Sequence, residues 1–286
     1  MRAIAKRVSF YFSAHPDDWQ LFMNPPASQD VLDEDCRCVF VHMTAGDAGY
    51  GLEHDAGKPP FYLARENGAE AAIRYIADAD ERPPVEAGVS VVTFKGHAIR
   101  CVRYRNTAAY FLRLPDGSPA GCGYATTGYQ SLTRLANGEI DTMTAVDGTA
   151  VYRGWDDLTS TLRGIIDFER APDRAVALHV PELDPAFNAD DHADHYMTAK
   201  AALAAAASIP ARVVHHVGYA CRHLPENLPA ADRDMKRAVF AVTLQGVFAL
   251  GHQFPWPEDD VFVGRNYCRV EDRPRSAATG GTPIAN

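Results

Sequence analysis

The chain has 286 residues, and 28 lysine and arginine residues against 37 aspartate and glutamate residues give a formal net charge of −9. Hydrophobic residues make up 47% of the sequence and charged residues 23%, which is typical of a soluble globular protein and excludes disorder for most of the chain. The acidic balance also argues against a nucleic-acid-binding protein, because such proteins need clustered basic residues to neutralise phosphates.

Targeting and redox signals favour a cytoplasmic protein. The basic N-terminal residues precede only a short apolar run, 8–14, which makes a poor signal peptide. No run of 18 apolar residues occurs, so we expect no membrane-spanning helix. The six cysteines are scattered, and we expect reduced thiols rather than disulfides or a zinc knuckle. Nothing in the sequence indicates the oligomeric state.

The N-terminal part alternates strands with a helix. Residues 8–13 and 38–44 are rich in β-branched and aromatic residues and are predicted to be buried strands. Polar residues and prolines separate them. A glycine-rich loop, 45–51, follows the second strand, and residues 61–77 carry apolar side chains at helical spacing. This order of elements is typical of an α/β domain.

The middle of the chain changes character. Residues 89–94, 97–105 and 107–114 are short β-rich runs separated by turn residues. They predict a small antiparallel β patch within a β-rich insertion at about 89–128.

The second half returns to alternating helices and strands. Apolar spacing predicts helices at 155–168, 193–208 and 232–250 and strands at 174–180 and 211–217. We therefore expect one α/β domain over residues 1–270, with a mostly parallel sheet flanked by helices. A loose polar tail is expected at 271–286.

Two polar clusters each follow a predicted buried strand. The first runs from His15 to Asp18 and the second from Asp190 to His195. In open parallel sheets, ligands bind beyond the carboxyl ends of the strands, so the fold can bring both clusters to one rim. Each cluster taken alone is more typical of a turn followed by a helix cap than of a functional site.

Together the clusters offer a three-ligand set for a metal ion, His15, Asp18 and His195. Three protein ligands with an open position for water are the arrangement of catalytic zinc. Zinc lowers the pKa of its bound water to about 7, so hydroxide becomes available near neutral pH. The same donors would also suit Fe²⁺ or Co²⁺.

The remaining polar residues of the clusters suit acid–base chemistry. Asp17 is expected beside the water as a general base. His192 is expected on the opposite side, where it would stabilise an oxyanion or donate to a leaving group, with Asp194 orienting it.

The motifs resemble those of the PIG-L (LmbE-like) zinc-dependent N-deacetylases. The segment Ala14-His15-Pro16-Asp17-Asp18 resembles that family's Ala-His-Pro-Asp-Asp motif, and His192-Ala193-Asp194-His195 resembles its His-x-Asp-His motif. Thr44 to Gly49 looks like its Thr-x-Gly-(Glu/Asp)-x-Gly loop, and Arg65-Glu66 looks like its Arg-Glu helix. The resemblance covers residues 8–217. The middle region is similar to the branch that includes deacetylases of glycopeptide-antibiotic sugars.

The resemblance implies a Rossmann-like fold and removal of an acetyl group from an N-acetylglucosamine-type sugar, carried by a small molecule or a glycoconjugate. It also implies one Zn²⁺ per chain. The roles implied are zinc ligands (His15, Asp18, His195), general base (Asp17), oxyanion or amine partner (His192), orientation of that histidine (Asp194) and sugar contact (Asp47, Arg65).

One position departs from the family pattern, and two other functions stay open. Trp19 stands where relatives usually have an acidic residue, and it would either line a sugar site or belong to the core, the second being favoured. One alternative function is an amidase acting on a different acyl group or a thiol conjugate. The other is a non-catalytic, sugar-binding relative. The glycines at 46–51 do not match a nucleotide-binding fingerprint.

Overall fold

The computed structural model describes residues 5–52, 57–79, 83 and 85–274. Its centre is a mixed eight-stranded sheet with the strand order β10-β9-β8-β1-β2-β5-β4-β3. The strands are β1 (Arg7–Ser13), β2 (Cys36–Thr44), β3 (Gly88–Phe94), β4 (His97–Tyr104), β5 (Thr107–Leu114), β8 (Ala175–Pro181), β9 (Ala211–His216) and β10 (Cys268–Arg273). The five neighbours β9, β8, β1, β2 and β5 run parallel, whereas β10, β4 and β3 are antiparallel additions at the edges. The predicted α/β class with a mostly parallel sheet is confirmed.

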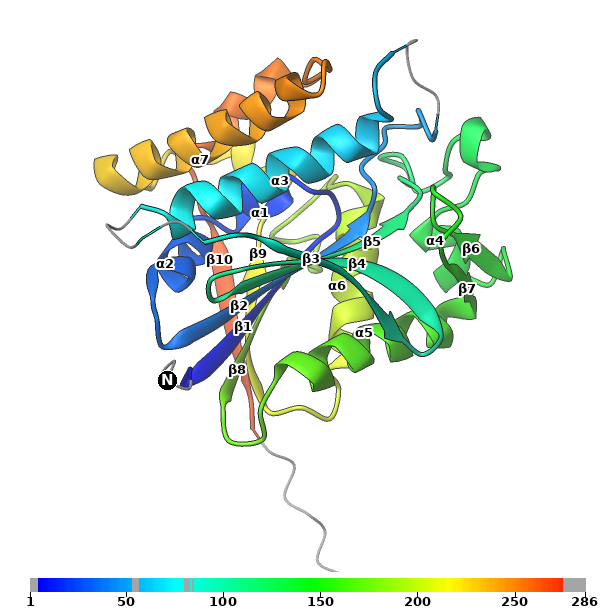
Figure 1. Cartoon of the computed structure of the whole chain (residues 1–286), viewed down its shortest axis with the longest axis horizontal. Coiled ribbons are helices and arrows are strands. Elements are labelled where there is room, and N and C mark those ends of the chain that lie inside the picture. Colours follow the sequence, from blue (N-terminus) through cyan, green and yellow to red (C-terminus); the bar gives the residue numbers. More distant parts are fainter. Residues whose placement is uncertain (1–4, 53–56, 80–82, 84, 275–286) are drawn as a thin grey trace, which may run out of the picture.

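Helices cover both faces of the sheet (Figure 1). One face carries α1 (Asp18–Phe22), α2 (Pro26–Leu32), α3 (Phe61–Ala77) and α7 (Ala230–Ala249). The other carries α4 (Leu132–Ala136), α5 (Gly154–Glu169) and α6 (Ala193–Ala205). Three 3₁₀ helices, η1 (Ala125–Thr127), η2 (Tyr219–His223) and η3 (Pro257–Phe262), lie in the connections.

The central strand β1 is buried on both sides because apolar residues occupy both of its faces. Side chains alternate along a strand, so Val8, Phe10 and Phe12 join the core beneath α5 and α6. Tyr11 points to the other face, where it stacks on Phe40 of β2 in the core below α3. This double burial explains why three consecutive positions of the strand, 10–12, carry large aromatic side chains.

The strands predicted in the middle of the chain form close to the expected positions, and they widen the main sheet. β3 and β4 pair in antiparallel fashion, but β5 lies parallel to β2 and connects them to the centre. The separate antiparallel pair consists of β6 (Thr142–Thr144) and β7 (Val151–Arg153). The rest of the proposed insertion, residues 115–128, consists of loop and η1.

The structure differs from the sequence prediction at two further places. Between β1 and β2, the polar and proline-rich stretch contains α1 and α2, and Pro26 occupies the first turn of α2, where its missing N–H costs nothing. Residues 271–273, which were predicted to belong to the tail, pair with β9 as part of β10. Residues 275–286 lie outside the described part.

Two expectations about the whole chain can be compared with the structure. None of the six cysteines is paired in a disulfide. Within the described ranges, none of the helices combines the length and apolar character needed to cross a bilayer.

Helices α3 and α7 approach closely at Gly68 and Gly246. A Cβ atom on Gly68 would lie 2.7 Å from the carbonyl oxygen of Thr243. We expect Gly68→Ala to lower the free energy of unfolding by about 1–3 kcal/mol, because backbone atoms would have to move. Denaturant unfolding measures this change.

The matched control is Gly164→Ala in α5, where the added Cβ would meet only the Phe94 side chain, at 3.3 Å. A gain in helix propensity makes that change near neutral. Equal effects at the two positions would contradict the close-contact account.

Lys236 of α7 is fully buried, and its ammonium group donates to the carbonyl oxygen of Arg265. Burial lowers its pKa to about 7, although Cys221 opposes the shift. Between that value and 10.5 the unfolded chain binds more protons than the folded chain, so this residue makes stability rise with pH.

Lys236→Met should therefore remove the rise in stability between pH 7 and 10. It should also raise the free energy of unfolding at pH 7 by about 2–4 kcal/mol. The neighbouring exposed residue provides a control, because Arg237→Met should keep the pH dependence. An unchanged pH profile in Lys236→Met would show that the buried amine is not responsible.

Candidate functional site

The carboxyl ends of the five parallel strands meet at one edge of the sheet, and the loop after each strand supplies polar side chains. These are His15, Asp17 and Asp18 after β1, Asp47 after β2, Asp116 after β5, Asp191 to His195 after β8, and Tyr219 and Arg222 after β9. The chain leaves β1 for β2, its neighbour on one side in the sheet, whereas β8 is its neighbour on the other side. The strand order therefore reverses at β1, and the carboxyl end of β1 is a topological switch point, where ligands bind in such sheets.

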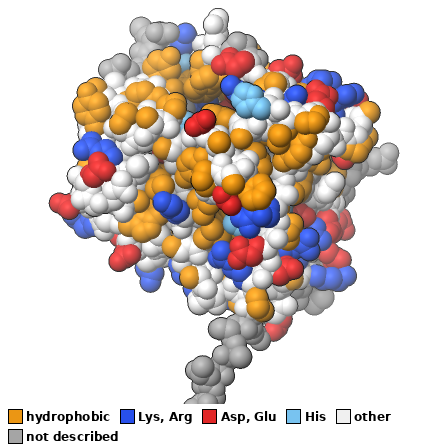
Figure 2. Space-filling view, turned by 180° about the vertical axis from the view of Figure 1, so that it is seen from behind, with side chains coloured by type: hydrophobic (Ala, Val, Ile, Leu, Met, Phe, Trp, Pro, Cys, Tyr) orange, Lys and Arg blue, Asp and Glu red, His pale blue; other side chains and the backbone are white. Residues whose placement is uncertain are grey.

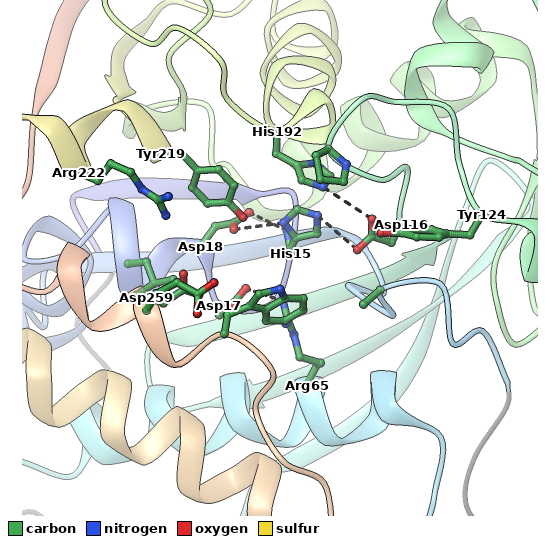
Figure 3. A pocket seen from close by; sticks show the side chains of 15 residues that line it. His15, Asp17, Asp18, Arg65, Asp116, Tyr124, His192, Tyr219, Arg222 and Asp259 are labelled. Carbon is green, nitrogen blue, oxygen red and sulfur yellow. Dashed lines mark hydrogen bonds and ion pairs between the residues drawn. The ribbon is translucent and has the colours of Figure 1, made fainter.

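A cavity of about 260 Å³ opens at this edge. Five of the residues singled out in the sequence line it, His15, Asp17, Asp18, Arg65 and His192 (Figure 3). The structure thus brings the two motifs, far apart along the chain, to one place.

His15, Asp18 and His195 form a buried group whose ligand atoms lie within 4.8 Å of one another. Asp18 Oδ1 is 3.3 Å from both His15 Nδ1 and His195 Nε2. Among the described residues, His195 Nε2 has no hydrogen-bond partner although it is buried. Two imidazole nitrogens and a carboxylate oxygen are a donor set that fits zinc, so this group could hold a divalent metal ion.

The surroundings of His195 favour a positive charge. Its Nδ1 lies 2.9 Å from both carboxylate oxygens of Asp191, which in turn accept hydrogen bonds from Asn188 Nδ2 and the backbone N–H of Tyr219. Burial alone would lower the pKa of His195, but Asp191 and Asp18 outweigh it and raise the pKa to about 10. A carboxylate behind a histidine is the usual support of a metal ligand.

The imidazole of His15 is held between the two clusters. Its backbone N–H donates to Asp18 Oδ2 at 2.7 Å, which fixes the turn after β1. Its Nε2 lies 3.5 Å from Asp194 Oδ2 and 3.8 Å from Asp116 Oδ2. The two ring nitrogens therefore face carboxylates on opposite sides.

Both the backbone N–H and the carboxylate of Asp194 lie beside His192, whose Nδ1 is 3.8 Å from Asp194 Oδ2. The Asp194 N–H donates to His192 Nδ1 at 3.2 Å, which leaves the ring proton on Nε2, 3.8 Å from Asp116 Oδ1. Burial and the neighbouring His15 lower the pKa of His192 to about 3, so the ring is neutral near pH 7. The Asp194 carboxylate also accepts the N–H of Gly117 at 2.8 Å.

Asp17 and Arg65 form a buried ion pair at the cavity wall. Arg65 Nη2 lies 2.6 Å from Asp17 Oδ1, and the guanidinium stacks 4.8 Å from the ring centroid of Trp256. Burial raises the pKa of Asp17, and Arg65 opposes that rise. Arg65, which the resemblance assigned to sugar contact, is thus also the partner that positions Asp17.

Asp47 and Trp19 lie outside the cavity lining. Asp47 is fully buried, and its two oxygens accept the backbone N–H groups of Asp116 and Gly51 at 2.9 and 2.8 Å. It therefore shapes the loop that carries Asp116. Trp19 is also fully buried and packs 4.7 Å from Phe40, so its predicted place in the core is confirmed.

Several residues of the cavity wall were not predicted from the sequence. They are Asp116, Tyr124, Tyr219, Arg222, Trp256 and Asp259. Tyr219 and Arg222 follow the strand predicted at 211–217, so the rule that ligands bind at strand ends could have found them. Asp116 likewise follows the strand predicted at 107–114, whereas no pattern in the sequence marks Trp256 or Asp259.

The support of His195 by Asp191 gives a prediction about metal affinity. Asp191→Asn should weaken divalent metal binding about 10–100-fold, because the carboxylate that accepts from His195 Nδ1 is lost. Competition with a chromophoric chelator measures this affinity. The exposed neighbour serves as control, since Asp190→Asn leaves the support intact. Equal affinities in the two variants would remove Asp191 from the site.

Comparisons with known proteins find no match, so the functional assignment rests on the geometry of the site. Neither a scan against models of protein families nor a search of curated proteins finds a match for this chain. The resemblance to the deacetylase family therefore stays a prediction, and its support is the buried group of His15, Asp18 and His195 beside one cavity.

Proposed function

We propose that the chain is a zinc-dependent hydrolase that removes the acetyl group from an N-acetylglucosamine-type sugar and releases acetate and a free amine. The observation that carries this proposal is the meeting of three elements at one cavity. They are a metal-ligand group, of which His15 and Asp18 line the cavity, the carboxylate of Asp17 and the neutral imidazole of His192.

His15, Asp18 and His195 are the residues that would hold the ion. A divalent ion there would supply the Lewis acidity that activates water and polarises an amide carbonyl. The field of Asp18 and Asp191, which raises the pKa of His195, also favours the binding of such a cation.

Asp17 is suited to take the proton of the attacking water. Its contact with Arg65 fixes the carboxylate at the cavity wall, and burial raises its pKa, which makes it a stronger base. The same proton is then available to the amine as the C–N bond breaks. Water and amide thus give acetate and amine without another reactant.

His192 is suited to stabilise the negative charge that develops on the amide oxygen. Its Nδ1 is occupied by the Asp194 N–H, so the Nε2 proton is directed into the cavity. A neutral, fixed N–H donor can stabilise an oxyanion without reorganising during the reaction.

The cavity wall supports a sugar as the substrate. Carboxylates such as Asp116 can accept hydrogen bonds from hydroxyl groups, and the rings of Tyr124, Tyr219 and Trp256 offer faces for the C–H surfaces of a pyranose.

Asp17→Asn should retain the metal and the fold but lose about 10²–10⁴-fold in turnover, because an amide cannot accept the proton. Acetate release from N-acetylglucosamine glycosides measures turnover, and elemental analysis of the same sample verifies the metal content. Full activity in this variant would refute the assignment of the base. Absence of acetate release from every such glycoside by the metal-loaded wild type would refute the proposed function.

A further inference from the structure

One end of the cavity contains two charged groups that the proposed reaction does not use. Figure 3 shows Arg222 and Asp259 at this end, with Asp116 and Tyr124 at the other end and His15 between them. Arg222 belongs to η2 and Asp259 to η3, so the C-terminal part of the chain builds this end.

Asp259 is a carboxylate without a partner. Its side chain lines the cavity although the residue is only 8% exposed, and no described side chain forms a hydrogen bond or ion pair with it. Burial, with a further contribution from Asp17, raises its pKa to about 7. Burying such a group without a partner is unfavourable, so a ligand that donates a hydrogen bond there would offset the cost.

Arg222 is held in place by aromatic rings rather than by an acid. Its guanidinium carbon lies 5.7 Å from the ring centroid of Tyr219 and 5.1 Å from that of Phe262. Across the residues that the structure describes, no carboxylate lies within ion-pair distance of it. Arg222 and Asp259 therefore line the same end of the cavity, and among the described residues neither has an ion-pair partner.

The acidic and basic side chains at this end of the cavity restrict the chemical class of the ligand that can bind there. An anionic group would face Asp259 and Glu258, and a cationic group would face Arg222 and Arg65. Hydroxyl groups both donate and accept, so a neutral polyhydroxylated ligand satisfies a carboxylate and a guanidinium at the same time. The ring of Trp256 beside them adds an apolar face of the kind that sugars pack against.

We propose that the Arg222–Asp259 end of the cavity binds a second, uncharged hydroxyl-bearing unit of the substrate, such as another sugar ring. This inference rests on the proposed function. It states that the enzyme acts on the acetylated amino sugar within a larger glycoside in preference to the monosaccharide.

The test compares acetate release from N,N′-diacetylchitobiose and from N-acetylglucosamine. In the wild type, kcat/KM should be at least about ten-fold higher for the disaccharide, which is equivalent to about 1.4 kcal/mol of additional binding. Asp259→Ala and Arg222→Ala should each reduce this ratio toward one. Arg222 is exposed, so its variant tests the subsite even if Asp259→Ala fails to fold.

Two exposed neighbours provide matched controls. Asp260→Ala on η3 and Arg237→Ala on α7 remove the same charges outside the cavity lining and should keep the wild-type ratio. A ratio of one in the wild type would overturn the proposal, as would an unchanged ratio in both cavity variants. A preference for N-acetylglucosamine 1-phosphate that Arg222→Ala abolishes would also overturn it, because the site would then recognise an anion.

A binding measurement distinguishes failure of the proposed function from failure of the subsite. If the metal-loaded wild type releases acetate from neither sugar, calorimetric binding of the same two sugars still tests the subsite. The disaccharide should bind the wild type at least ten-fold more tightly than the monosaccharide, and Asp259→Ala should remove that difference. Equal binding of both sugars would overturn the subsite itself.

Discussion

The parallel direction of β9, β8, β1, β2 and β5 is the constraint on which the candidate site depends. Because these strands run the same way, the loops that follow them leave the sheet at one edge. The motif after β1 and the motif after β8 are distant in sequence, yet β1 and β8 are neighbours in the sheet. Their polar residues therefore meet, and the loops after β2, β5 and β9 close the wall around them. Double burial of β1 by apolar side chains holds this arrangement in place.

Buried charge is the second feature that connects the fold to chemistry. Asp18 and Asp191 lie on opposite sides of the His195 ring, and His195 Nε2 has no hydrogen-bond partner among the described residues. Such a group is costly to bury unless a cation or a proton compensates it, and two imidazoles with a carboxylate offer the ligands that zinc prefers. Asp17 has a different environment, because Arg65 forms an ion pair with it directly. Neighbouring carboxylates of one motif thus have environments suited to different tasks.

The periodicity of apolar residues was sufficient to predict most of the fold. The helix at 61–77 and the strands around 8–13 and 38–44 follow from local patterns, since burial on one or two faces is visible in the sequence. The pairing of β5 with β2 was not predictable, because partner choice between strands depends on contacts remote in sequence. The same limit applies to the site. The motif residues could be named from their positions after strands, but Trp256 and Asp259 reach the cavity from the far C-terminal part without any local signal. The backbone support of His192 by Asp194 was also invisible, because it depends on how the helix begins.

Metal content tests the central claim most directly, namely that the motifs after β1 and β8 form one ion site. Elemental analysis would compare the wild type with His195→Ala after identical purification in the presence of zinc and removal of the excess. The account predicts about one zinc ion per chain in the wild type and a large loss in the variant, because one of three ligands is removed. A wild type without bound metal, or a variant that retains the full amount, would contradict it.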